Sequence, residues 1–245
     1  MKHPLVEQLI DAQLSFLDQE FTQSGTIKAE FNEFYGGADD VETGNVLSTG
    51  SVNALVFNTN DHSNAVCIDR YNIYDGLSRP NYNLPTSLNY FTGGYGHDGI
   101  ASNPMVQYTA LGNIYRNMLG VHSACGQTGL FKNCTFENVS SFISVDRNNG
   151  NYIMENCRGN IEQLLYGTNI NFTFAWKNND ITVRDLARGM AGFVRYSEGS
   201  GSVNLTFDGG SLDVRGVRAD AAPANNTIVR VKNGNLKINN LKVYP

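Results

Sequence analysis

The stretch Gly129-Leu-Phe-Lys-Asn-Cys-Thr-Phe-Glu-Asn-Val139 combines short runs of alternating apolar and polar residues with asparagines beside them. Alternate side chains of a strand point to opposite faces, so Cys134 and Phe136 are expected to share one face. Asparagine tolerates the positive φ that a sharp turn requires, which makes Asn138 a candidate for a bend. The stretch therefore predicts short strands separated by tight turns.

Segments of this kind recur through the rest of the chain in two interleaved series. The first series comprises residues 133–138, 154–157, 172–178, 204–208 and 236–239, and the second comprises 142–146, 164–166, 192–196 and 228–231. The step within a series is about 20 residues at first and about 30 later, which fits one coil plus insertions of variable length. A single coil cannot bury its inner face, but stacked coils bury a continuous column of side chains.

The repeats predict an all-β fold in which residues 128–245 form a right-handed parallel β-helix. Bends are expected where an Asn or Gly precedes a new apolar strand, which occurs at Asn138, Asn160, Asn179, Gly210 and Asn240. Residues 38–127, rich in Tyr and Gly, are expected to hold the first, irregular coils of the same β-helix.

Residues 1–37 are predicted to be α-helical and to serve in assembly or capping. Apolar residues recur at helical spacing in a first helix that begins at Pro4, as Val6, Ile10 and Leu14 illustrate. A second short helix is expected from Ile27 to Tyr35, before Gly36-Gly37.

Composition excludes several classes of protein. The chain has 245 residues, of which 41% are hydrophobic and 17% charged, with a net charge of -5. Such a chain can bury a core, but it lacks the clustered Lys and Arg that nucleic-acid binding needs. No run of about 18 apolar residues predicts a membrane span, and no signal peptide is expected at the N-terminus. The four Cys form no CxxC pair, so buried free thiols are expected rather than a metal site, and no cofactor is implied.

The coil at Gly129–Val139 resembles those of the pectate-lyase-like β-helix superfamily, and the likeness covers roughly the last 115 residues. The superfamily includes pectin-degrading enzymes, alginate epimerases and bacteriophage tailspikes. Free Cys and the abundance of Asn, Gly and Tyr are more similar to the phage group. The resemblance implies a virion protein, a homotrimer, and contact with a host-surface polysaccharide or with other virion proteins.

Two carboxylates that face one groove would suit polysaccharide hydrolysis. The candidate pairs are Glu137 with Glu155, and Asp146 with Glu162 or Glu198. A lyase would need a base, for which His97, beside Asp98 in a glycine-rich loop, is the candidate. Each of these residues also fits an ordinary surface or turn position.

Aromatic side chains are the candidates for glycan contact, because their faces can stack on sugar rings. Candidate residues are Tyr82, Tyr90, Tyr95 and Trp176. The alternative for Trp176 is packing inside the coil, and for the tyrosines it is contact between subunits.

Three functions follow as expectations. The first is a phage-type virion protein, of the tailspike or tail-fibre kind, that contacts a host-surface glycan as a homotrimer. The second is a polysaccharide depolymerase, either glycosidase or lyase, that uses a carboxylate pair. The third is a structural protein that decorates a capsid or joins a tail and binds no glycan.

Overall fold

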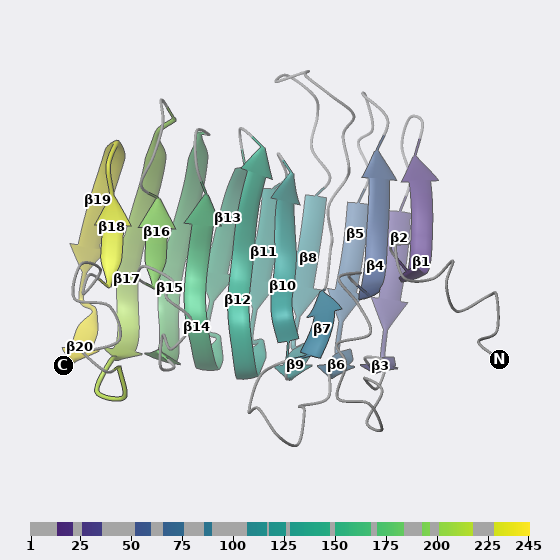
Figure 1. Ribbon diagram of the computed structural model, residues 1–245, viewed down its shortest axis with the longest axis horizontal. Helices are drawn as coiled ribbons and strands as arrows, with labels where there is room; N and C mark the ends of the chain where they lie inside the picture. Colours follow the sequence, from purple (N-terminus) through teal and green to yellow (C-terminus); the bar gives the residue numbers. More distant parts are fainter. Residues whose placement is uncertain are drawn as a thin grey trace, which may run out of the picture.

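The computed structural model describes residues 14–21, 26–35, 52–59, 66–75, 86–89, 107–116, 118–125, 128–147, 150–167, 171–183, 193–196, 201–217 and 228–245. Within these ranges the chain is all β, every strand pairing is parallel, and no helix occurs. The sheet is curled, and its strands follow one another along the long axis of the molecule (Figure 1).

The strands form three parallel ladders, which we call A, B and C. Ladder A runs through β2 (Thr26–Glu30), β5 (Val66–Arg70), β8 (Gln107–Leu111), β11 (Thr128–Lys132), β13 (Gly150–Glu155), β15 (Phe172–Val183), β17 (Val203–Asp213) and β19 (Gly234–Asn239). Ladder B runs through β3 (Glu33–Tyr35), β6 (Ile73–Asp75), β9 (Ile114–Arg116), β12 (Thr135–Arg147), β14 (Arg158–Gly167), the second halves of β15 and β17, and β20 (Lys242–Tyr244). Ladder C runs through β1 (Leu14–Phe21), β4 (Val52–Thr59), β7 (Thr86–Asn89), β10 (Met118–Cys125), the second halves of β12 and β14, β16 (Val194–Tyr196) and β18 (Val229–Val231).

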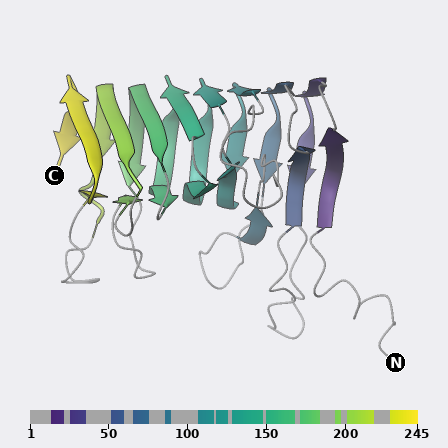
Figure 2. The same ribbon diagram turned by 90° about the horizontal axis from the view of Figure 1, so that it is seen from above.

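The chain visits the ladders in the repeating order C, A, B, and we call one such pass a rung. The first rung is β1, β2 and β3, and the last rung is β18, β19 and β20. These two rungs lie at opposite ends of the molecule (Figure 2). Strands from all three regions expected from the sequence share the ladders, because β1 pairs with β4 and β8 pairs with β11.

The two predicted N-terminal helices are wrong in the part of the chain that the structure describes. Residues 14–21 and 26–35 contain β1, β2 and β3, while residues 4–13 lie outside the described ranges. In β2, the buried Ala29 lies between Lys28 and Glu30, which is the alternation of a strand. Apolar-rich segments fit helical and strand periodicities alike. The pairing of β2 with β5 along its full length favours the strand, because it satisfies the backbone hydrogen-bonding groups and buries one face.

The second sequence series is a set of structural repeats. In the first series, 154–157, 172–178, 204–208 and 236–239 lie in or at the end of ladder A, whereas 133–138 spans the following turn and the start of ladder B. The second series lies in ladder C, where Ile143, Leu165, Val194 and Val229 occupy successive rungs. Lys132 and Glu155 are neighbours 23 residues apart, and Asn204 and Asn235 are neighbours 31 residues apart. The chain between rungs thus lengthens while the pairing register is kept, as the growing step predicted.

A left-handed residue begins every turn from ladder A to ladder B, which we call the AB turn. These residues have φ between 51° and 73° and are Phe31, Tyr71, Gly112, Asn133, Asn156, Asn178, Gly209 and Asn240. Of the bends expected from the sequence, Asn240 is one of this set, and Asn179 and Gly210 directly follow a member of it. Asn138 and Asn160 mark a different bend, between ladders B and C, where the N–H of Asn138 donates to Oδ1 of Asn160 at 2.6 Å.

The core lies between the ladders and consists of stacked columns of side chains. In ladder A, one column holds Phe131, Met154, Trp176 and Phe207, all buried. Rings from different ladders meet in the interior: Phe142 of ladder C lies 4.7 Å from Phe131 of ladder A and 5.0 Å from Phe136 of ladder B, measured between ring centroids. The curled sheet therefore encloses one apolar interior.

Candidate functional site

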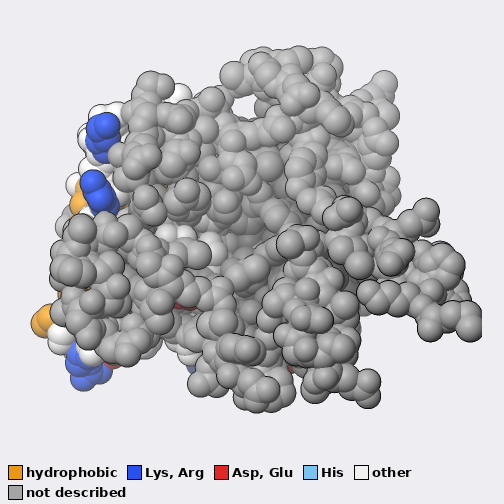
Figure 3. Space-filling model, in the orientation of Figure 1, with side chains coloured by type: hydrophobic (Ala, Val, Ile, Leu, Met, Phe, Trp, Pro, Cys, Tyr) orange, Lys and Arg blue, Asp and Glu red, His pale blue; other side chains and the backbone are white. Residues whose placement is uncertain are grey.

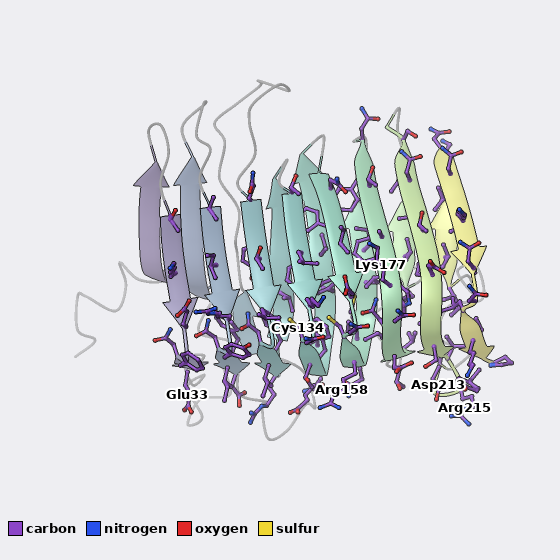
Figure 4. All side chains as sticks on the ribbon, turned by 180° about the vertical axis from the view of Figure 1, so that it is seen from behind. Glu33, Cys134, Arg158, Lys177, Asp213 and Arg215 are labelled. Carbon is purple, nitrogen blue, oxygen red and sulfur yellow. The ribbon has the colours of Figure 1, made fainter. Side chains whose placement is uncertain are left out.

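The outer face of ladder A carries its side chains in three columns, each parallel to the long axis. Parallel in-register pairing places equivalent residues of successive rungs about 4.8 Å apart. We call them the polar, aliphatic and charged columns. Figure 4 shows this face, with Lys177 of the charged column labelled.

In the charged column, neighbouring charges alternate in sign. From the first rung to the last it reads Glu30, Arg70, Leu111, Lys132, Glu155, Lys177, Asp208 and Asn239. Arg70 Nε lies 2.7 Å from Glu30 Oε1, and Lys132 Nζ lies 2.7 Å from Glu155 Oε1. Like charges directly opposite each other would destabilise the sheet, so the alternation favours this register.

Glu155, a candidate catalytic carboxylate, belongs to this column. The hydrogen bond from Lys132 lowers the pKa of Glu155, and the charges of Lys132 and Lys177 act in the same direction. Glu155 is therefore ionised at neutral pH and neutralised by cations on both sides. A general acid needs the opposite shift, since it must hold its proton near neutral pH.

Glu137, the proposed partner of Glu155, lies in ladder B instead. Oε2 of Glu137 is 3.3 Å from Nε of Arg116. Nη1 of the same arginine lies 3.8 Å from Oδ2 of Asp75. Asp75, Arg116 and Glu137 occupy successive rungs and again alternate in sign. Glu137 and Glu155 thus belong to separate ladders, and each contacts its own cation.

The remaining candidate acids and bases are not brought together by the described part of the structure. Glu162 lies in β14 and is buried, at 4% exposure, beside Gln163. Asp146 lies in β12, but its side chain is outside the described residues, as are His97 and Glu198.

Trp176 lies in the core at 0% exposure, with its Nε1 donating to the carbonyl of Gly209 at 2.9 Å. Its ring packs on Phe207, 5.5 Å away between centroids. The indole is therefore not available to stack on a sugar, which corrects its assignment as a glycan-binding residue. Tyr82, Tyr90 and Tyr95 lie outside the described residues.

The polar column is the surface feature that sequence reasoning missed. Its exposed amide and hydroxyl side chains run without interruption over six rungs: Gln107, Thr128, Asn151, Thr173, Asn204 and Asn235. Asn235 Nδ2 donates to Asn204 Oδ1 at 2.7 Å, so adjacent members contact each other. These groups offer both donors and acceptors to a ligand. The regular spacing of these residues is visible in the sequence. Each polar-column residue stands four positions before the charged-column position of the same strand.

The aliphatic column lies beside the polar column on the same face. Its half-buried members include Thr109, Leu130, Ile153, Ala175 and Thr206. Polar groups next to a shallow apolar strip suit a ligand that has hydroxyls on its edges and C–H groups on its faces. A sugar chain has both.

A buried polar cluster surrounds Asp69, which lies in the interior between Ala29 and Ala110 of the adjacent rungs. Its Oδ1 accepts hydrogen bonds from Asn72 Nδ2 at 2.5 Å and from the Tyr74 hydroxyl at 2.7 Å. Its Oδ2 accepts from the Tyr108 hydroxyl at 2.6 Å. The small alanines leave room for these rings. Asp69 is fully buried, so the cluster is closed to a substrate and acts in stability.

Tyr115 completes this cluster. Its hydroxyl accepts a hydrogen bond from Asn113 Nδ2 at 3.1 Å, and its ring stacks on Tyr74 with centroids 5.2 Å apart. Burial, followed by the charge of Asp69, raises the pKa of Tyr115 well above its ordinary value. Tyr115 therefore keeps its proton and serves as a neutral hydrogen-bonding group.

Cys134 and Cys157 are buried free thiols, as predicted, on adjacent rungs of the AB turn. Burial, followed by a hydrogen bond with Cys157, raises the pKa of Cys134 well above its ordinary value, so this thiol is no activated nucleophile. The side chains of Cys67 and Cys125 are outside the described residues. Among the described residues no His, Cys, Asp and Glu gather in a group that could hold a metal ion.

No helix in the described ranges is long and apolar enough to cross a membrane. Comparison with known proteins gives no family: no family model, no curated protein and no solved structure matches this chain.

Proposed function

We propose that this chain is a right-handed parallel β-helix of the pectate-lyase-like kind that works as a surface component of a phage-type virion and contacts a host-surface glycan. Three in-register parallel ladders around one apolar interior support the architecture. The resemblance of the Gly129–Val139 coil to phage appendage proteins supports the setting.

The polar column is the observation that carries the glycan proposal. A column of exposed amides and hydroxyls, from Gln107 to Asn235, lies beside the aliphatic column on one face. An extended polysaccharide lying along the column would meet one new polar side chain at each rung, about every 4.8 Å. Weak contacts repeated along one chain add up in affinity.

A purely structural role in the virion is the second candidate. It is favoured by the way described charges neutralise one another within the ladders, as Lys132 and Glu155 do. A depolymerase is less well supported, because Glu155 and Glu137 contact separate cations in separate ladders.

The expected homotrimer remains a prediction. It was to be held partly by N-terminal helices, and the described part of that region is β-strand. Within the described residues, a lateral contact would use a face of the ladders.

The glycan proposal is tested by a matched pair of variants in the same strand. Thr173→Arg places a bulky cation in the polar column, whereas Thr182→Arg places it on the exposed outer face of ladder B. Binding to surface polysaccharides purified from candidate bacterial hosts is measured by glycan array and calorimetry. Thr173→Arg should weaken binding at least about tenfold, a loss of about 1.4 kcal/mol, while Thr182→Arg should leave it unchanged.

Equal binding by the two variants, or the absence of binding to every surface polysaccharide tested, would contradict the glycan proposal. Binding of the chain to glycan-free virion particles would then favour the structural role.

A further inference from the structure

Large apolar side chains are exposed at two places in the described part of the chain. Four of them lie in the last rung, at the end of the molecule where Figure 3 shows apolar and basic side chains together. The other two are Phe31, 73% exposed, and Tyr71, 47% exposed, at the AB turns of the first two rungs. Figure 4 shows these turns along one edge of the sheet, with Glu33 marking the first rung. Tyr71 is exposed although rungs lie on both sides of it, so an open end of the stack does not account for its exposure.

The rings of Phe31 and Tyr71 form one continuous surface, which we call the aromatic platform. Their centroids are 5.3 Å apart and their planes are inclined by 17°, so the two rings stack from one rung to the next. On the side of the third rung, the Tyr71 ring lies against Gly112, where a Cβ would be 2.8 Å from ring atoms of Tyr71. The glycine therefore leaves the space that the Tyr71 ring occupies.

The AB turn itself does not require aromatic residues. Tyr71 has a φ of 55° and donates its N–H to the carbonyl of Leu111 at 2.9 Å. Asn133 has a φ of 56° and donates in the same way to the carbonyl of Glu155 at 3.0 Å. The other six AB turns use Asn or Gly, which tolerate this left-handed conformation, whereas a bulky aromatic residue is strained in it. Strained residues cluster at ligand-binding sites, so the two rings point to a ligand and not to the turn.

The size of the aromatic platform fits a small ring better than a protein partner. If a full aromatic side chain offers about 150–250 Å², the exposed fractions of Phe31 and Tyr71 offer roughly 180–300 Å² together. A stable protein interface buries about 800 Å² on each partner. The apolar neighbours Ile73 and Leu111 are half-buried and add little to the exposed area.

The charges beside the aromatic platform are balanced. Arg70 directly precedes Tyr71 and forms an ion pair with Glu30, which directly precedes Phe31. A phosphate or carboxylate on a ligand would have to compete with Glu30 for Arg70, which disfavours nucleotides and acidic sugars. A neutral pyranose ring has no such cost. Its C–H face can stack on the aromatic rings, and its hydroxyls can hydrogen-bond to polar groups at their rim.

We propose that the aromatic platform binds a neutral pyranose ring, whose C–H face stacks on Phe31 and Tyr71. This inference deepens the proposed function and rests on it for its setting, because the sugar would belong to the host-surface glycan. The polar column begins only at Gln107 in the third rung, so the aromatic platform supplies a sugar contact in the two rungs that this column does not reach.

The test replaces the aromatic residues by the residue that other AB turns use. Phe31→Asn/Tyr71→Asn removes both rings and relieves the strain, so the double variant should unfold at the same temperature as wild type or a higher one. Binding of the neutral methyl glycosides of glucose, galactose, mannose and N-acetylglucosamine to the full chain is measured by saturation-transfer NMR titration. Wild type should bind at least one of them, and the double variant should bind it at least about tenfold more weakly. Asn133→Gly, at the AB turn of the fourth rung, is the matched control and should bind as wild type does.

Unchanged binding by the double variant, or no binding of any of the four glycosides by wild type, would overturn the proposal. A fall in the unfolding temperature of the double variant by more than about 4 °C would also overturn it, because the rings would then serve to support the fold.

The same variants separate this proposal from the proposed function. If Thr173→Arg loses binding to a surface polysaccharide while Phe31→Asn/Tyr71→Asn keeps it and still binds the methyl glycosides, the proposed function stands and the aromatic platform fails. If wild type binds a methyl glycoside through the two rings but no surface polysaccharide, the aromatic platform stands and the proposed function fails.

Discussion

The main-chain N–H of Cys157 donates a hydrogen bond to Oδ1 of Asn179, 2.7 Å away on the next rung. Asn179 in turn donates from Nδ2 to the carbonyl of Met154 at 2.8 Å. Each such side chain therefore ties its own rung to the preceding one at the AB turn. Cys157 does the same with sulfur: its thiol accepts from the N–H of Cys134 at 3.4 Å and donates to the carbonyl of Phe131 at 3.5 Å.

Asn179→Ala should destabilise the protein by about 2–6 kcal/mol, because it leaves two buried backbone groups without a partner, each costing about 1–3 kcal/mol. Asn204→Ala, in the exposed polar column, is the matched control and should change the free energy of unfolding by less than about 0.5 kcal/mol. Urea unfolding followed by circular dichroism measures both. Equal losses for the two variants would show that the AB-turn contacts do not stabilise the stack.

Asp69→Ala should be among the most destabilising single changes, at about 3 kcal/mol or more, because it removes the acceptor of three buried donors. In a Tyr74→Phe/Tyr108→Phe background the same change should cost less, since two of those donors are already absent. Urea unfolding of the four proteins gives the coupling energy. A coupling of zero would contradict the hydrogen bonds from these tyrosines to Asp69.

Glu155→Gln should lower stability at neutral pH by no more than about 1 kcal/mol, because the ion pair with Lys132 is partly exposed. The folded-state pKa of Glu155 is lowered, so its contribution is present above the unfolded-state pKa of about 4.3 and is lost as pH falls through the folded-state pKa. The difference between wild type and variant should therefore shrink towards zero in acid.

Unfolding free energies at pH 7 and near pH 3 check this dependence on pH. Lys132→Met should remove most of the same contribution and reduce the effect of Glu155→Gln to the part that Lys177 supplies. A difference that grows in acid would have the wrong sign for a salt bridge.

Gly159→Ala should destabilise the protein by at least about 1–3 kcal/mol, the cost of a strained backbone conformation. Gly159 has a φ of +132°, and a Cβ there would lie 1.9 Å from the carbonyl oxygen of Phe136. Gly216→Ala is the control, since nothing lies within 4 Å of a Cβ at that position. Thermal unfolding of both variants measures the effect. A loss of stability confined to Gly159→Ala would support the close packing between β12 and β14.

The sequence predicted the repeating part of this fold because local patterns decide it. Alternation in Cys134-Thr-Phe136 and the bend residues Asn138 and Asn240, which are left-handed in the structure, are visible without any partner strand. The N-terminal strands could not be recognised in that way. The apolar residues of 14–21 fit a helix equally well, and only the pairing of β1 with β4 settles the conformation.

Which residues form the outer columns depends on the pairing register between strands, and this register cannot be read from the sequence alone. Glu155 looked like half of a catalytic pair until pairing placed Lys132 and Lys177 on either side of it. Trp176 was ambiguous for the same reason, because an inward and an outward position differ by a shift of one residue. The cluster around Asp69 joins residues up to 44 positions apart. Its only sign in the sequence is an acidic residue within an apolar run.

The most direct test of the stacked in-register ladders is a pair of distances between spin labels. Labels at Thr128 and Asn235 are four rungs apart, and labels at Thr26 and Asn235 are seven rungs apart, all at the same register position of ladder A. At about 4.8 Å per rung, electron paramagnetic resonance should give about 19 Å and about 34 Å between the labelled backbones. Distances that do not scale with the number of rungs would contradict the stacked architecture.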